Sequence, residues 1–144
     1  MQTIFGIPIS VLVLVIEIFV LGVLIVGWAY GSRKRRNFKI HHRAIWLVVL
    51  LHILTVGFWM IPVALDRLSI SLSNPLLYWY QILHDIVGLL AIGLGALLVL
   101  VFLIKGGMPG KLVKRTKPFM LLTIGIWLLA FVLGLYWFFL GWAP

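Results

Sequence analysis

Four apolar runs divide the chain, and each run is long enough to cross a lipid bilayer as a helix. They cover about residues 8–30, 44–65, 75–104 and 119–140. An α-helix rises ~1.5 Å per residue, so roughly 20 residues span a hydrocarbon core about 30 Å thick. With 64% hydrophobic residues among only 144, the chain is too apolar to bury them in a soluble core. We therefore predict one all-α integral membrane domain, residues 1–144.

Helix-starting and aromatic residues mark the ends of these runs. Pro8 stands where the first turn of a helix tolerates proline, and Asn74-Pro75 indicates the N-cap and first residue of the third span. Tyr78-Trp79-Tyr80 is typical of the aromatic belt at a membrane–water boundary. Residues 68–73 alternate apolar and hydroxyl side chains, which favours a connector that lies at the interface.

Positive charges between the runs predict the topology. Six of the twelve Lys and Arg residues lie between the first two runs, five lie between Lys105 and Lys117, and Arg67 lies in the middle connector. By the positive-inside rule, the basic loops are cytoplasmic and both termini lie outside. Short connections make consecutive helices antiparallel, so we predict an up-and-down four-transmembrane-helix bundle. The charges serve as topology signals in this interpretation, and no nucleic-acid partner is expected.

The chain lacks the residues or motifs that several classes of function require. The chain has no cysteine, which excludes disulfides, cysteine-ligated zinc, iron–sulfur clusters and covalently attached c-type haem. It has no Walker loop, nucleophile elbow, paired-carboxylate site or His-Glu-x-x-His motif, so nothing points to a hydrolase or an ATPase. The N-terminus has no basic region and no cleavage site of a secretory signal, and the first run is expected to remain as a helix. We do not expect an enzyme that acts on its own.

Ionisable residues inside the predicted spans require a reason, because a central charge costs roughly 2.5–3.5 kcal/mol on insertion scales. His84 lies about one turn inside the aromatic belt and shares a helical face with Gln81, Gly88, Ala91 and Gly95. Small residues below a histidine let a flat macrocycle approach, which predicts an axial ligand to a b-type haem iron or to another tetrapyrrole. Alternatively, the small residues form an ordinary helix interface across which His84 hydrogen-bonds.

The other histidines lie at the start of the second span. His41 and His52 are eleven residues apart and share a face, whereas His42 points about 80° away. They are further candidate cofactor ligands, although His41 and His42 beside Arg43 also fit a basic cluster at headgroup level. His52 and His84 on antiparallel helices would differ in depth by about 10–15 Å, so we do not expect them to share one iron.

Met60 lies at the predicted depth of His84 and is a candidate second axial ligand. Asp85 points about 100° away from the face of His84, as an orienting partner or as an interfacial acid. Glu17 falls near mid-membrane, at about the depth of Thr55 and close to His52. It is expected to hydrogen-bond to one of those two residues, or to serve as a proton relay or a quinol contact.

Short motifs between about Lys39 and Tyr136 resemble a prokaryotic four-span family of unknown function that includes a haem A and cytochrome oxidase assembly factor. More distantly, the pattern is similar to the haem-binding cytochrome b bundles. By that resemblance, His42 and His84 would be the functional histidines, and a third would precede the fourth span, where this chain has Lys114-Arg115-Thr116. The motifs are His42-Arg43, Tyr78-Trp79-Tyr80-Gln81-Ile82-Leu83-His84, Gly110-Lys111-Leu112-Val113-Lys114-Arg115-Thr116-Lys117, Gly125-Ile126-Trp127-Leu128 and Gly134-Leu135-Tyr136.

Two functional hypotheses follow. The first is a haem-associated small subunit of a respiratory-type complex, active in electron transfer or oxidase assembly, in the prokaryotic cytoplasmic (inner) membrane. The second is a non-catalytic accessory subunit whose seven tryptophans and small-residue faces pack against lipid and other integral membrane subunits. A binder of another tetrapyrrole, such as a chlorophyll held by His84, is a third possibility.

Overall fold

The computed structural model describes residues 3–4, 7–32, 37–105 and 110–140. Within these ranges the chain is helical except for a two-stranded hairpin and one turn. It has four helical stretches long and apolar enough to cross a membrane: Ser10–Gly31, Phe38–Ser73, Trp79–Ile104 and Lys111–Phe139. The prediction of an all-helical multi-pass membrane protein is thus confirmed. Two predicted basic or glycine-rich loop segments, residues 33–36 and 106–109, lie outside the described residues.

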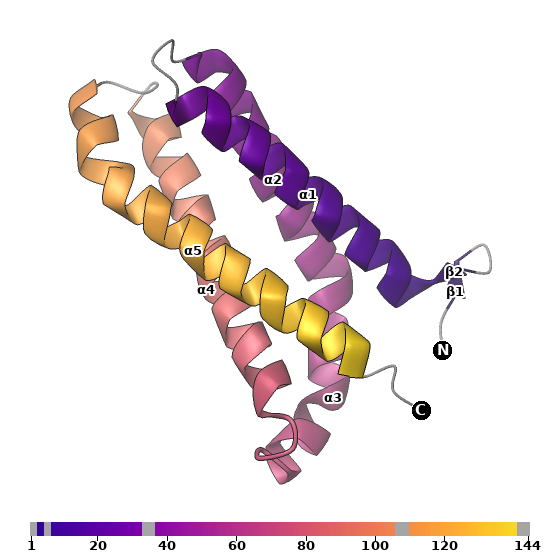
Figure 1. Cartoon of the computed structure of the whole chain (residues 1–144). Helices are drawn as coiled ribbons and strands as arrows, with labels where there is room; N and C mark the ends of the chain where they lie inside the picture. Colours follow the sequence, from indigo (N-terminus) through magenta and orange to yellow (C-terminus); the bar gives the residue numbers. More distant parts are fainter. Residues whose placement is uncertain (1–2, 5–6, 33–36, 106–109, 141–144) are drawn as a thin grey trace. The chain divides into compact units, whose positions relative to one another are not determined.

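The chain divides into two compact units, Met1–Phe58 and Trp59–Pro144, which we call unit 1 and unit 2. Unit 1 opens with the antiparallel strands β1 (Thr3–Ile4) and β2 (Ile7–Pro8), in which Thr3 pairs with Pro8 and Ile4 with Ile7. Helix α1 (Ile9–Ser32) follows directly, and α2 (Phe38–Thr55) runs beside it (Figure 1).

Helices α1 and α2 form an antiparallel hairpin. Glu17 meets His52, and Gly27 further along α1 meets His41 nearer the start of α2. The buried residues of α1 recur at intervals of three and four, which places them on one stripe. This stripe consists of Glu17, Val20, Leu24 and Gly27.

Helix α2 begins six residues before the predicted span. Asn37 is its N-cap, and the side-chain Oδ1 of Asn37 accepts a hydrogen bond of 3.3 Å from the backbone N–H of Ile40. An Asn side chain satisfies one of the free N–H groups at a helix start, so the polar residues before Ala44 are also helical. His41 and His42 therefore lie on the helix and not in a loop.

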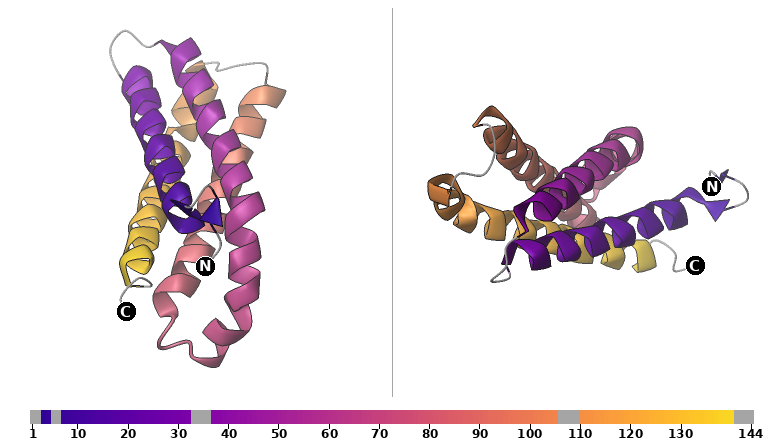
Figure 2. Two further views of the ribbon diagram at one scale, coloured as in Figure 1. Left: turned by 90° about the vertical axis from the view of Figure 1, so that its right-hand side faces the viewer. Right: turned by 90° about the horizontal axis from the view of Figure 1, so that it is seen from above.

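A π-helical turn, Val56–Met60, joins α2 to α3 (Ile61–Ser73). It ends two residues before Pro62, whose ring would clash with the carbonyl four residues earlier, that of Phe58, in a regular α-helix. A wider turn relieves such a clash without ending the helix. Residues 68–73, which were predicted to form a connector between two spans, are the last part of helix α3 (Figure 2).

The predicted role of Asn74-Pro75 at the start of the third span is wrong. Asn74 is the C-cap of α3, and α4 (Trp79–Ile104) begins after Tyr78. The backbone carbonyl of Asn74 accepts hydrogen bonds from the N–H groups of Leu77 at 3.0 Å and Tyr78 at 3.2 Å. Asn74 thus closes a tight turn between the two helices, and its side chain does not cap α4.

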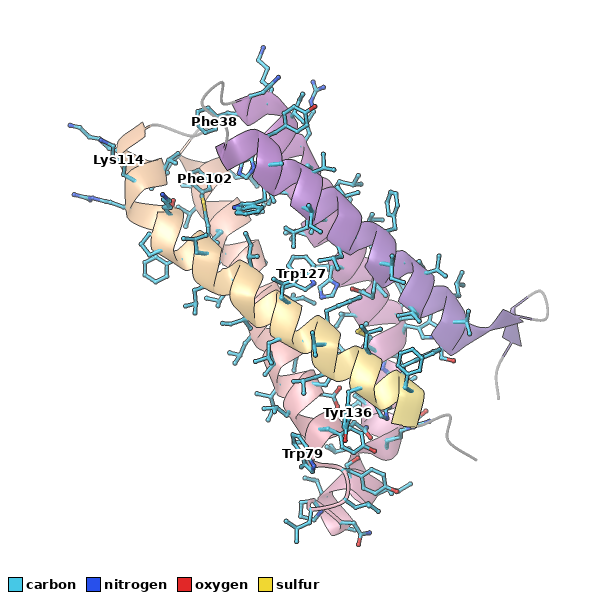
Figure 3. The ribbon with its side chains drawn as sticks, in the orientation of Figure 1. Phe38, Trp79, Phe102, Lys114, Trp127 and Tyr136 are labelled. Atoms are coloured by element: carbon cyan, nitrogen blue, oxygen red, sulfur yellow. The ribbon has the colours of Figure 1, made fainter. Side chains whose placement is uncertain are left out.

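Helix α5 (Gly110–Leu140) packs antiparallel to α4. Trp79 and Tyr136 lie at one end of this hairpin, and Phe102 and Lys114 lie at the other (Figure 3). Helix α5 begins nine residues before the predicted start of the fourth span at residue 119, since the basic segment before it is helical and Pro118 lies inside the helix. Thr116 donates its hydroxyl to the carbonyl of Leu112 at 2.9 Å, the i−4 back-bond that threonine commonly makes within a helix.

Candidate functional site

A buried polar contact joins the two helices of the unit 1 hairpin. Nδ1 of His52 lies 3.0 Å from Oε1 of Glu17, and the two residues are 6% and 7% exposed. Thr55, the other predicted partner of Glu17, donates its hydroxyl to the carbonyl of Leu51 at 2.9 Å. The structure therefore brings Glu17 together with His52 and not with Thr55.

His41 also faces α1, as its spacing from His52 predicted. Its Nδ1 lies 2.7 Å from the carbonyl oxygen of Gly27. A carbonyl oxygen only accepts, so Nδ1 of His41 carries a hydrogen. A Cβ at Gly31 would lie 2.7 Å from the same Nδ1, so the imidazole occupies space that only glycine leaves open.

His42 points away from this stripe and bonds within its own helix. Nε1–H of Trp46 donates to Nε2 of His42 at 3.1 Å, one helical turn along α2. Because a tryptophan nitrogen only donates, Nε2 of His42 carries no hydrogen and its lone pair is used. Nδ1 is thus the ring nitrogen of His42 that this bond leaves available.

His84 in unit 2 repeats the arrangement of His41. Its Nδ1 lies 2.8 Å from the carbonyl oxygen of Ala130 on α5 and must donate the hydrogen. A Cβ at Gly134, one turn further along α5, would lie 2.8 Å from Cε1 of His84. We call these two arrangements the unit 1 notch (Gly27, Gly31, His41) and the unit 2 notch (Ala130, Gly134, His84).

Sequence reasoning missed the notches, although the sequence carries a signal for them. In each, a small residue and a glycine are four apart on one helix, and a histidine on the partner helix bonds the carbonyl of the first. Small residues at this spacing let helices approach closely in membranes. A search for two small residues four positions apart on one predicted helix, with a histidine on the neighbouring helix, would have included both notches.

Aromatic side chains lie beside His84 and at the same end of the unit 2 hairpin. The rings of His84 and Trp137 have centroids 6.1 Å apart, and the guanidinium of Arg67 on α3 lies 5.4 Å from the centre of the Trp137 ring. Tyr80 and Tyr136 meet edge to face at 5.4 Å. The two helices that hold His84 are therefore joined by ring contacts at the Trp79 end of unit 2.

The other residues that the sequence marked as site candidates make fewer specific contacts than the histidines. On the face of His84, Ala91 and Gly95 are buried, whereas no atom lies within 4 Å of a Cβ built at Gly88. Asp85 is half-buried and makes no hydrogen bond to another described residue, and Met60 ends the π-helical turn. Among the residues that the structure describes, no three or more His, Cys, Asp or Glu side chains form a group suited to a metal ion.

Comparison with family models, curated proteins and solved structures finds no match for this chain. The two histidines marked by the sequence resemblance differ in their surroundings. His42 is bonded inside α2, whereas His84 is bonded across its hairpin to α5. The geometry of His84 therefore carries the functional argument.

Proposed function

We propose that this chain is a small multi-pass membrane protein that binds a haem through Nε2 of His84. The observation that supports this proposal is the hydrogen bond from Nδ1 of His84 to the carbonyl oxygen of Ala130. Metal-binding histidines commonly donate their other ring nitrogen to a carbonyl, which selects the tautomer and orients the ring. In the neutral ring, Nε2 then carries the lone pair that an iron ion accepts.

A single histidine ligand suits a metal ion whose other ligands are the nitrogens of a tetrapyrrole ring. His84 supplies one nitrogen, and a haem iron or a chlorophyll magnesium takes one or two axial ligands from a protein. The open space beside Gly88, one turn from His84 on the same face, supports the approach of a flat group. Met60 as the second axial ligand, a tetrapyrrole other than haem, and His41, His42 and His52 as further ligands stay predictions.

The cellular setting forms part of the proposal. The distribution of Lys and Arg supports basic loops in the cytoplasm and both termini outside, in a prokaryotic cytoplasmic membrane. A single histidine-bound haem suits an electron-transfer or oxidase-assembly subunit of a respiratory-type complex, as the resemblance implies. The apolar outer faces of the helices would contact lipid and partner subunits.

A reduced-minus-oxidised visible spectrum of the purified protein, from cells supplied with haem, tests the proposal. We expect a haem band in the unsubstituted protein that His84→Ala and His84→Gln both remove. Glutamine keeps an N–H donor for the carbonyl of Ala130 but offers no imidazole, so it separates loss of ligation from loss of folding. His42→Ala is the matched comparison: it should keep the band if His84 is the ligand, and loss of the band would instead support His42 as a ligand, since the hydrogen bond described for His42 lies within α2.

Two results would overturn haem binding at His84. One is a folded, unsubstituted protein that carries no tetrapyrrole after expression with excess haem. The other is a band that persists unchanged in His84→Gln. Either result would leave the second candidate function, the accessory subunit.

The accessory role is favoured by glycines on outward faces. Gly22, Gly93 and Gly125 are exposed, and no atom lies within 4 Å of a Cβ built at any of them. Such positions let a helix of another subunit approach closely. Bulky replacements such as Gly93→Leu should then reduce co-purification of partner subunits while the isolated chain stays folded. Unchanged co-purification in all three replacements would count against this role.

A further inference from the structure

We propose that Glu17 and His52 form a buried proton-binding site that holds one exchangeable proton between α1 and α2. The proposal concerns unit 1 and does not depend on haem binding at His84 in unit 2. It rests on the distance of 3.0 Å between Oε1 of Glu17 and Nδ1 of His52 and on the burial of both residues.

The net charge of the pair determines how many protons it holds. With both acidic protons bound the pair carries one positive charge, and with neither it carries one negative charge. Both forms are disfavoured in apolar surroundings, whereas the form with one proton is neutral overall. That proton lies either on Oε1 of Glu17 or on Nδ1 of His52. Its transfer breaks an O–H bond as an N–H bond forms, and no electrons are gained or lost.

Buried apolar side chains lie on the same two stripes as the pair, and no other charged side chain of α1 or α2 lies within two helical turns of Glu17 or His52 along its own helix. Val20 and Val48 on the same stripes are fully buried, and Val49 is 7% exposed. The only other titratable side chain of α1 is Tyr30, thirteen residues from Glu17. Those of α2 all precede His52 by nine residues or more, which is over two helical turns. They are Lys39, His41, His42 and Arg43.

The size of the site favours a proton over a larger ligand. A quinol was an alternative from the sequence, but its ring would have to reach two side chains that are both more than nine-tenths buried. A proton needs no cavity, since it can occupy the existing hydrogen bond. The competing interpretation is a permanent interhelical hydrogen bond whose proton never exchanges.

The composition of the chain allows this difference to be measured directly. Glu17 is the only glutamate and His52 is one of four histidines. Carboxyl-¹³C glutamate therefore reports Glu17 alone, and ¹⁵N-histidine reports the four rings in one NMR titration of the full-length protein in micelles. We expect the Glu17 signal and one histidine signal to stay constant over a middle pH range, in which the pair holds one proton, and to shift together in the step at which the pair gains or loses a proton, because strongly interacting groups titrate as a pair.

Two substitutions test whether the shared shift belongs to Glu17 and His52. Glu17→Gln should abolish the shift of that histidine signal at the shared pH, and His52→Gln should abolish the shift of the carboxyl signal there. Both keep a polar side chain in the contact, and circular dichroism will verify folding. His42→Ala is the control and should leave both shifts in place.

Two outcomes would overturn the proton site. In the first, neither signal shifts over the whole pH range in which the protein stays folded, which would establish a permanent hydrogen bond. In the second, the carboxyl signal shifts at the same pH with and without the His52 imidazole. The titration needs no bound haem, so failure of haem binding would not affect it.

Discussion

The imidazole of His84 occupies the space that a side chain on Gly134 would need. A Cβ at position 134 would lie 2.8 Å from Cε1 of His84, closer than such atoms approach in proteins. The same ring donates its Nδ1–H to the carbonyl of Ala130, one turn earlier on α5. Glycine at position 134 is therefore a condition for the hydrogen bond that orients His84.

Gly134→Ala should displace the His84 ring and weaken the α4–α5 hairpin. We expect a loss of about 1–3 kcal/mol in the free energy of unfolding, the usual cost of overpacking. Denaturant unfolding in micelles measures it. Gly125→Ala on the same helix is the control and should cause no loss, because no atom lies within 4 Å of its Cβ position. Equal effects of the two substitutions would contradict the notch.

Gly27→Ala should push α1 away from α2. Its new Cβ would lie 2.9 Å from Cβ of Ala44, a contact between two helices that neither side chain can relieve by rotation. We expect a loss of about 1–3 kcal/mol in unfolding free energy. Ala44→Gly in the same chain should recover most of that loss, which a double-mutant cycle measures. Additive effects of the two substitutions would show that the residues do not touch.

Asn37→Ala should shorten α2 at its start. Removal of the Oδ1 atom leaves the N–H of Ile40 without its capping acceptor. We expect a loss of about 0.5–2 kcal/mol in stability, the range measured for N-caps. Asn37→Asp should keep the cap. Faster hydrogen exchange at Ile40 in the alanine variant, but not in the aspartate variant, is the corresponding local measurement.

Ser71→Ala should leave the protein as stable or more stable. The hydroxyl of Ser71 is buried and has no hydrogen-bond partner in the part of the chain that the structure describes. A buried unsatisfied polar group costs about 1–3 kcal/mol, which alanine removes. Ser73→Ala is the matched comparison, because the hydroxyl of Ser73 is exposed and bonds the carbonyl of Ser69 at 2.7 Å. Thermal unfolding of the two variants in micelles should therefore rank Ser71→Ala above Ser73→Ala, and the reverse order would indicate a partner for Ser71.

Helix boundaries were predicted less well than helix existence. Asn74-Pro75 looked like the start of a span because asparagine caps helices at either end and proline is common just after one. The backbone carbonyl of Asn74 decides the matter by closing a turn with Leu77 and Tyr78. Likewise, the basic residues before Pro118 were predicted to form a loop. Hydropathy identifies the apolar part of a helix that can contact lipid, but it does not detect polar turns that continue the same helix beyond it.

The sequence by itself determined that four helices are long and apolar enough to cross a membrane, because the cost of burying charge in lipid acts on each segment separately. It also determined that His41 and His52 share a face, which follows from the period of one helix. Only the tertiary structure decided that His52 meets Glu17 and that Ala130 orients His84. Such contacts depend on the register between two helices, which is determined by where small residues allow their backbones to approach, and no single segment contains that information.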